Sequence, residues 1–417
     1  MDATRFVDSV FGSPVQGPGN KYAFTYYLPK PLPRRAPLTE PVVTVLSEAD
    51  AALGNLEGLG ILIGDPQLLI GPYLHREALA SSRIEGTQTS LSDVFQAEVT
   101  EAAKTDATRE VQRYLAATRQ AFTLVKTLPI TQRLLLQVHE TLLRGVRGEN
   151  RRPGQFRSSP VWVGSADATP YSAVFVPPIP EHLPALMGDW ERFVNADGRA
   201  LPALIQAAMA HYQFETIHPF LDGNGRIGRL VINLILTERK RLTQPLLYLS
   251  HYFETHRDEY YGHLQRTRES GDITDWLVFF LDAVREQAHD AVRRSRRLIG
   301  IREEYRQEAI RTRGHLARLV EMIVQNPYLT ARSVEDALGI TNAGAHNVIR
   351  RAEGLGWLRS IGRRGRGGQE SWVAPEILQV LEAPMLYEQS DRSAELSENP
   401  SSLSTQESSQ DSSAWSG

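Results

Sequence analysis

The sequence has 417 residues, with 46 lysines and arginines against 49 aspartates and glutamates, and a formal net charge of -3. The lack of cysteine excludes disulfides, thiolate zinc sites and a cysteine nucleophile, and the length predicts about two or three domains. The balanced charge does not indicate nucleic-acid binding overall, and no apolar run reaches the roughly 18 residues of a membrane span. We expect a globular protein of the reducing cytoplasm.

The first 40 residues are rich in proline and glycine, which cannot form a long helix, so we expect an extended N-terminal arm over 1–40. Residues 41–127 have a mostly helical pattern, with one helix over 74–84 that ends at Gly86. The pattern also predicts turns at Gly60, Gly64 and Gly71-Pro72.

Residues 128–300 form the next predicted region, which begins with an amphipathic helix over 128–151. Two short apolar runs then flank a polar turn and predict a β-hairpin. Its first run contains Val161, Trp162, Val163 and Gly164, and its second spans 173–178. Helices are predicted to resume at Pro180 and continue to about Arg313, and regular apolar spacing supports those over 203–217 and 227–236.

Residues 315–381 form a second compositional unit that resembles a winged helix. Helices are predicted over 315–325, 331–338 and 341–355, followed by a strand over 357–361, a basic glycine turn over 363–368 and a strand over 371–373. The polar side chains of the third helix and the basic turn are compatible with DNA contact, and a protein-binding or dimerising module is the other interpretation. Residues 388–417 are almost devoid of apolar side chains, so we expect disorder.

One segment combines side chains that can bind phosphate and transfer a proton. A helix ends near His218, and a new helix begins near Arg226, after Gly223, Asn224 and Gly225. Such a turn can point several N–H groups into one concavity at a helix N-terminus, which attracts phosphate. Arg229 lies three residues after Arg226, so both guanidinium groups share a helix face.

Asp222 and His218 add a second kind of chemistry to this segment. A carboxylate beside phosphate oxygens is the usual way in which proteins hold Mg²⁺. An imidazole has an unperturbed pKa of about 6.5 and accepts a proton at neutral pH. A base, a metal ligand, an anion cradle and two cationic groups are the requirements for moving a phosphorus group onto a hydroxyl. No Gly-Lys-Ser/Thr follows the glycines, so the loop is not a P-loop.

The order of these residues resembles the Fic signature H-x-F-x-[D/E]-G-N-G-R-x-x-R, and Phe220 completes the match. The resemblance implies a mainly α fold, with a helical core and a short β-hairpin flap that aligns a target protein. It further implies AMP transfer from ATP, as co-substrate, to a Ser, Thr or Tyr hydroxyl of a target protein. His218 would then be the base, and Asp222 would bind Mg²⁺. The implied nucleotide-binding residues are Gly223, Asn224, Gly225, Arg226, Ile227, Gly228, Arg229 and, against the adenine, Tyr261.

A second segment, Ser81 to Gly86, resembles the inhibitory motif of the same family, [S/T]-x-x-x-E-[G/N]. Ser81 and Glu85 are four residues apart and share a helix face. The resemblance implies that Glu85 pairs with Arg229 and so occupies the arginine that should hold the γ-phosphate.

Alternatives to an ATP-dependent AMP transferase remain. The chain would be a DNA-binding regulator if its Fic region only senses nucleotide. It would be a related enzyme if it uses UTP as the donor or removes AMP from proteins. The intact His218 favours an enzyme, and Asp222 with two arginines favours a triphosphate with Mg²⁺. Self-modification is expected, whereas the sequence does not identify the target protein or the oligomeric state.

Overall fold

The computed structural model describes the chain except for residues 63–66, 166, 197–200, 313, 365–368 and 385–417. Residues 1–382 form one compact unit, within which the predicted domain boundaries stay predictions. The predicted disordered tail, 388–417, lies outside the described residues. We find no helix among the described residues that has both the length and the apolar character to cross a membrane.

The fold is mainly helical, as predicted. The first helices are α1 (Glu40–Leu62), α2 (Gln67–Ile84), α3 (Leu91–Val99), α4 (Asp106–Leu124), α5 (Gln132–Leu143), α6 (Leu183–Val194) and α7 (Ala203–Ile217). The others are α8 (Asn224–Glu238), α9 (Ser250–Thr255), α10 (Arg257–Ser270), α11 (Thr274–Arg311), α12 (Leu316–Gln325), α13 (Ala331–Leu338), α14 (Asn342–Gly354) and α15 (Pro375–Glu382). Short 3-10 helices span Ala3–Arg5, Glu101–Ala103 and Pro180–His182.

The described strands form two small antiparallel sheets. Strands β1 (Gly12–Gln16) and β2 (Thr25–Pro29) make a hairpin, and β3 (Tyr328–Thr330), β4 (Arg359–Arg364) and β5 (Gln369–Val373) make a sheet of order β3-β5-β4. The hairpin lies within the arm that was expected to be merely extended. Its Thr-Tyr-Tyr-Leu run has the aromatic and β-branched residues that favour strands, and tyrosines 26 and 27 are buried there.

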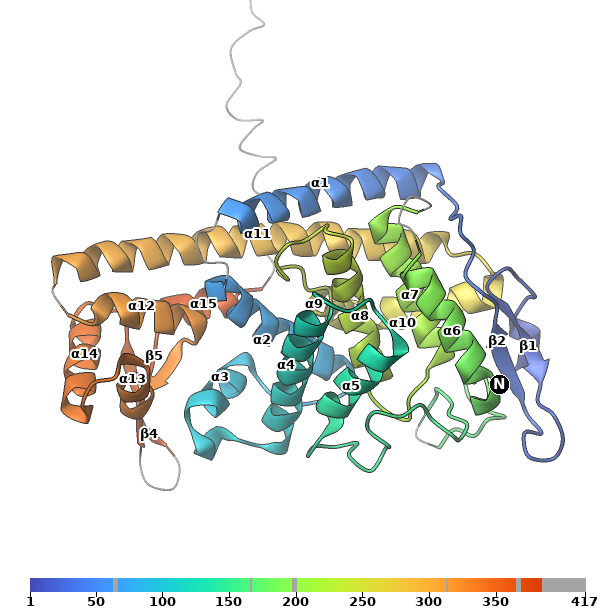
Figure 1. The fold of residues 1–417 in the computed structure, drawn as a ribbon, viewed down its shortest axis with the longest axis horizontal. Coiled ribbons are helices and arrows are strands. Elements are labelled where there is room, and N and C mark those ends of the chain that lie inside the picture. The colour runs from blue at the N-terminus through green and yellow to red at the C-terminus, as the bar shows by residue number, and fades with distance from the viewer. Residues whose placement is uncertain (63–66, 166, 197–200, 313, 365–368, 385–417) are drawn as a thin grey trace, which may run out of the picture. The chain divides into compact units, whose positions relative to one another are not determined.

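Helix α7 is the centre of the fold. Its residues from Leu204 to Ile217 are all buried, so this helix is enclosed on every side. The indole N–H of Trp190 donates to the carbonyl of Ala210 (2.9 Å), and that of Trp276 donates to the carbonyl of Ala208 (3.0 Å). Helix α8 packs against α7, and α1 lies along the long helix α11 (Figure 1). This packing fixes the α7–α8 connection in space.

Several local predictions need correction. Gly60 lies inside α1, and Gly71-Pro72 lies inside α2, because tertiary packing outweighs the weak helix propensity of these residues. Gly64 lies outside the described residues. The helix predicted over 128–151 is limited to α5, since Thr131 caps its start and the backbone of Arg144 is extended. The helices over 203–217, 227–236 and 331–338 are confirmed.

The predicted hairpin over residues 160–178 is much reduced. Its two segments do run antiparallel, but the residues described there share a single bridge, between Val163 and Phe175. Prolines at 160, 170, 177 and 178 deny a longer ladder its N–H donors. The second segment also bonds elsewhere, because the N–H of Tyr27 in β2 donates to the carbonyl of Val176 (2.9 Å).

In the C-terminal part, the three predicted helices correspond to α12, α13 and α14; the strand predicted over 357–361 overlaps β4 from Arg359, and the one over 371–373 falls within β5. The sequence interpretation did not include β3 or α15. Residues 365–368 of the basic turn lie outside the described residues. The order of elements therefore agrees with the predicted pattern, while the winged-helix assignment stays a prediction.

Candidate functional site

The site is the connection between α7 and α8, which two backbone features bend sharply. His218 ends α7 with φ 51°, an unusual left-handed conformation for a side chain larger than glycine, and Gly223 precedes α8 with φ 81°. The side chain of Asn224 holds the bend. Its Oδ1 accepts from the N–H of Phe220 (2.8 Å), and its Nδ2 donates to the carbonyl of Phe220 (2.9 Å). The predicted Gly-Asn-Gly turn is thus braced by its own asparagine.

The imidazole of His218 is uncharged at neutral pH. Burial and the charge of Arg157 lower the pKa of His218 to about 4. Its Nδ1 lies 3.4 Å from the carbonyl oxygen of Glu215 and must be the donor, because a carbonyl only accepts. The proton therefore sits on Nδ1, and Nε2 presents a lone pair. No hydrogen bond to this Nε2 is found within the described part of the chain.

Two buried residues outside the signature support the loop, and the sequence analysis missed both. His139 of α5 donates from Nε2 to the carbonyl of Asp222 (2.9 Å), accepts at Nδ1 from the N–H of Gly154 (2.9 Å), and stacks on Phe220 at 3.8 Å. Burial lowers the pKa of His139 to about 4. Arg157 donates from Nε to the carbonyl of His218 (2.8 Å). Their sequence surroundings are mixed polar and apolar and give no signal of this role.

Both signature arginines are buried and point charged groups at this site. Nη2 of Arg226 donates to Oδ1 of Asp222 (2.9 Å), and Nε of Arg229 donates to Oγ of Ser81 (3.0 Å). Nη2 of Arg229 also donates to the carbonyl of Ser81 and to Oε1 of Glu85, both at 2.8 Å. One buried N–H atom on each guanidinium, Nε of Arg226 and Nη1 of Arg229, has no partner among the described residues. Buried donors of this kind need an acceptor, which the site can receive from a ligand.

Gly225 explains how Glu85 reaches the loop. A Cβ atom at residue 225 would lie 2.2 Å from Oε1 of Glu85 and 2.8 Å from Nη1 of Arg229, so only glycine leaves room. Burial acts to raise the pKa of Glu85, but the charge and hydrogen bond of Arg229 outweigh it and lower that pKa. Glu85 is thus an ionised carboxylate held against the turn that was predicted to bind phosphate.

The helix end within the Ser81–Gly86 segment lies as the sequence predicts. Helix α2 ends at Ile84, and Gly86 follows with φ 93° while its N–H donates to the carbonyl of Arg83 (2.9 Å). Nη2 of Arg147 lies 3.4 Å from the carbonyl of Glu85 and bridges it to α4 through an ion pair with Glu110. The carboxylate of Glu85 is therefore held at a defined position.

Ile227 and Gly228 do not face an open site. Ile227 is buried, and its N–H already donates to the carbonyl of Gly223 (3.0 Å) inside α8. Gly228 packs against Glu215, since a Cβ there would lie 2.3 Å from Oε1 of that residue. Burial raises the pKa of Glu215 to about 7. The expected nucleotide contacts of residues 227 and 228 thus stay a prediction that this geometry does not favour.

Asp222 fits a metal that is shared with a phosphate. Its side chain is about one-third exposed, and one oxygen takes the bond from Arg226, so the carboxylate has room for a further contact. No cluster of three or more metal-ligating His, Asp or Glu side chains occurs within the described residues. An ion held here would need most of its oxygen ligands from phosphate and water, which is how Mg²⁺ is commonly bound.

The predicted flap and Tyr261 lie at the surface. Trp162, Val163 and Tyr261 are each about two-fifths exposed, whereas Phe175 opposite Val163 is buried. Burial raises the pKa of Tyr261 to about 12, and Arg257 lies over its ring at 5.5 Å. These exposed apolar side chains leave surface for a peptide or a base, although their roles stay predictions.

Comparison with known proteins agrees with this geometry. A family model described as Fic/DOC family N-terminal matches residues 43–123, and one described as Fic/DOC family matches residues 129–236, the segment with the bent loop. The chain thus contains a Fic/DOC family N-terminal domain followed by a Fic domain. The two matches cover α1 to α8 and include both Glu85 and the loop over 218–229.

Curated Fic relatives match over a shorter stretch. The chain is 36% identical over 154 residues to "Protein adenylyltransferase Fic" of Culex quinquefasciatus, and this covers 37% of the chain and 27% of the relative. It is 34% identical over 160 residues to the protein of the same name from Drosophila grimshawi, covering 38% and 29%. The chain thus spans little more than a quarter of these relatives.

Among solved structures, a Fic family protein from Desulfovibrio desulfuricans G20 resembles this chain with a TM-score of 0.53 and 21% identity. The likeness covers 82% of this chain and 98% of that protein. It confirms the mainly helical Fic fold.

Proposed function

We propose that this Fic protein transfers AMP from ATP to a hydroxyl side chain of a protein and releases pyrophosphate. The observation that carries the proposal is the pairing of two buried, unpartnered guanidinium N–H atoms with a neutral imidazole on one short loop. The guanidinium N–H atoms can bind the oxygens of a polyphosphate, and the imidazole can accept a proton. The adenylyltransferase names of the curated relatives support the same activity.

The proposed step is a single displacement at the α-phosphorus of ATP. The oxygen of a Ser, Thr or Tyr side chain attacks the α-phosphorus, its proton passes to Nε2 of His218, and the bond to the β-phosphate breaks. The N–H groups of Gly223 to Gly225 would bind the anionic oxygens at the start of α8. Arg226 and Arg229 would hold the β- and γ-phosphates, and Tyr261 would pack against the adenine.

Mg²⁺ is the metal that we propose for this reaction, with Asp222 as its protein ligand. When bound, it would neutralise charge on the phosphates. We expect no tight binding of Mg²⁺ without nucleotide, because Asp222 alone provides too few oxygen ligands.

We further propose that Glu85 inhibits the reaction. Its carboxylate and the γ-phosphate of ATP would both bind Arg229, and its Oε1 lies against Gly225 of the turn. Ser81 strengthens the competition, because its hydroxyl and carbonyl oxygens also accept from Arg229. ATP would bind with its γ-phosphate displaced, and transfer would be slow until α2 or Glu85 moves.

The segment over residues 160–178 would dock the target chain. Among the described residues of this segment, Val163 and Phe175 form the one bridge, so backbone groups beside it remain for pairing with an extended peptide. Exposed Trp162 and Val174 would contact apolar side chains of that peptide. The identity of the target protein, other than the chain itself, is left open.

DNA is a second candidate partner of the C-terminal part. Arg350 on α14 and Arg359 and Arg363 on β4 are exposed, which suits contacts to phosphates. Fluorescence anisotropy with a labelled duplex at two salt concentrations tests this, because counterion release makes such binding weaken steeply with salt. Binding that is absent at low salt would reject DNA and leave a protein-binding module.

The decisive test of the enzyme uses two labelled forms of ATP. We expect label from the α-phosphate, and none from the γ-phosphate, to become attached to protein when the Glu85→Gly variant is incubated with Mg·ATP. His218→Ala in the same background should abolish labelling and retain ATP binding. His263→Ala, which alters a histidine of α10, should change neither. Equal labelling with and without His218 would reject the base, and preferential labelling by UTP would change the donor.

A further inference from the structure

Arg157 is a buried arginine whose guanidinium is surrounded by backbone carbonyls. It is 2% exposed, and no carboxylate pairs with it within the described part of the chain. Nε donates to the carbonyl of His218 (2.8 Å), Nη2 to those of Ile217 (3.3 Å) and Pro178, and Nη1 to that of Ser159 (3.3 Å). A cation buried this deeply persists only where such bonds compensate for its lost hydration.

The bound carbonyls come from two places that the proposed reaction must hold together. Ile217 and His218 end α7, where helix carbonyls lack partners and the helix dipole favours a cation. The N–H of Arg157 also donates to the carbonyl of Pro219 (2.9 Å), so three consecutive carbonyls bind this one residue. Ser159 and Pro178 stand at the two ends of the segment that would dock the target.

We propose that Arg157 is a positioning residue that fixes the backbone of His218 relative to the target-docking segment. The inference rests on the proposed function, in which His218 accepts the proton. His218 has the left-handed conformation that costs free energy for a side chain, so it needs contacts that hold it. The bonds of Arg157 supply them on the carbonyl side, while α7 supplies them on the N–H side.

The charge of Arg157 provides a second readout. The charged groups that influence the pKa of His218 are Arg157 and Arg268, which lower it, and Glu85, which raises it. Removing the Arg157 charge should therefore raise the pKa of His218, whereas Arg157→Lys, which keeps a charge there, should shift it less. Arg157 itself stays charged at pH 7, because burial lowers its own pKa only to about 10.

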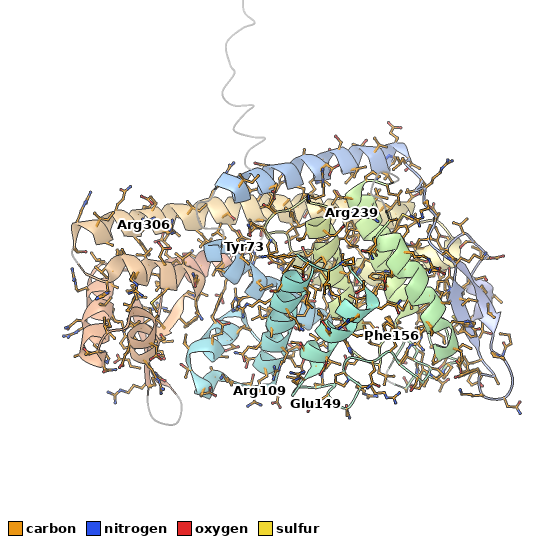
Figure 2. All side chains as sticks on the ribbon, in the orientation of Figure 1. Tyr73, Arg109, Glu149, Phe156, Arg239 and Arg306 are labelled. Atoms are coloured by element: carbon orange, nitrogen blue, oxygen red, sulfur yellow. The ribbon has the colours of Figure 1, made fainter. Side chains whose placement is uncertain are left out.

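Arg239 offers a matched control. It also donates from Nη2 to a helix-terminal carbonyl, that of Val194 (2.9 Å), and from Nε to the side chain of Gln206 (3.0 Å). It follows the C-terminus of α8, about 22 Å from the loop at the other end of this helix. Figure 2 shows Arg239 well apart from Phe156, the neighbour of Arg157. Arg239→Gln should cost comparable stability without touching the site.

The experiment compares Arg157→Gln, Arg157→Lys and Arg239→Gln, each in the Glu85→Gly background, by the rate of self-labelling with saturating α-labelled Mg·ATP. We expect Arg157→Gln to slow labelling about 10- to 100-fold, as a small displacement of a reacting group does, with the ATP dissociation constant changed less than twofold. Arg157→Lys keeps the charge but loses the planar guanidinium that bonds several carbonyls at once, so an intermediate rate is expected. Arg239→Gln should label at the parental rate per folded molecule.

Histidine NMR titration separates failure of this inference from failure of the proposed function. The His218 signal is identified among 11 histidines by its loss in His218→Ala. An upward shift of its pKa in Arg157→Gln, but not in Arg157→Lys or Arg239→Gln, supports the contact between Arg157 and His218 even if no nucleotide labels the protein, and slower labelling by Arg157→Lys than by the parent then supports positioning. An unchanged pKa, or equal slowing by Arg157→Gln and Arg239→Gln, would overturn it. Should Arg157→Gln not fold, Arg157→Lys decides: labelling and an ATP affinity equal to the parent would also overturn it.

Discussion

Replacing Glu85 with glycine tests the proposed brake directly. Oε1 of Glu85 lies 2.8 Å from Nη2 of Arg229, and the two side chains are 29% and 1% exposed. Opposite charges about 4 Å apart near a protein surface attract by roughly 4 kcal/mol before desolvation is counted. Because Glu85 is partly in contact with water, we reduce this to about 2–3 kcal/mol of competition against the γ-phosphate. Its removal should then speed transfer roughly 30- to 150-fold, at about 1.4 kcal/mol per tenfold.

The assay is the initial rate of protein labelling by α-labelled Mg·ATP. Glu85→Gly should label 30- to 150-fold faster than the parent, on the estimate above, and Glu85→Asp, which keeps the charge but shortens the reach, should lie between them. Glu254→Gln is the matched control, because Glu254 is similarly exposed and pairs at 3.6 Å with Arg83 in α2, the helix that precedes Glu85. It should label at the parental rate.

The same variant should be less stable without nucleotide. Removing Glu85 leaves the buried charge of Arg229 without its carboxylate, which costs up to about 3–5 kcal/mol in comparable buried pairs and less here because Glu85 is partly exposed. Mg·ATP should restore more of the melting temperature in Glu85→Gly than in the parent, since it replaces the lost anion. Parental labelling rates in Glu85→Gly, with ATP binding retained, would refute the reasoning.

Three further outcomes follow from the site. Self-labelling by Glu85→Gly should fall on the acid side below about pH 4 rather than near 6.5, because burial and Arg157 lower the pKa of His218 to about 4 and the loss of Glu85 removes a charge that raises it; a pH–rate profile down to the lowest pH at which the protein stays folded checks this. Glu215 keeps its proton in the folded state up to about pH 7, so its contribution to stability is complete below about pH 4.5 and is lost as the pH rises to 7. Urea titration of Glu215→Gln should therefore show less loss of stability between pH 5 and 8 than the parent, by at most about 3 kcal/mol. Asn224→Ala removes both bonds to the Phe220 backbone, which should cost about 1–3 kcal/mol by urea titration and weaken ATP binding measured by calorimetry.

The bent loop could be predicted from the sequence because its conformation depends on residues within it. Gly223 and Asn224 specify the turn locally, through a positive φ and two bonds to a neighbour four residues away. The same holds for α13, whose start is fixed by the capping box between Thr330 and Ser333 and whose end is fixed by Gly339. Such elements need no information from distant parts of the chain.

The supporting residues could not be predicted, because their roles depend on distant contacts. His139 bonds to a carbonyl 83 residues away, and Arg157 bonds to carbonyls about 60 residues away. Neither residue type has a spacing or period that would indicate such a partner. Pro72 gave a misleading signal for the related reason that packing of α2 against α4 and α9 outweighs the cost of one lost helix bond.

These supporting contacts explain why the signature alone would not make a site. The loop between α7 and α8 accepts bonds at His218, Pro219 and Asp222 from Arg157 and His139, all at main-chain carbonyls that any amino acid would offer. These supporting bonds hold the backbone from outside and do not use the side chains of His218 and Asp222. The same division applies to Arg229, whose Nε and Nη2 are bound by α2 and whose Nη1 is not. Since Nη1 is buried, a phosphate should reach it only after Glu85 or α2 moves, which links nucleotide binding at this arginine to release of the proposed brake.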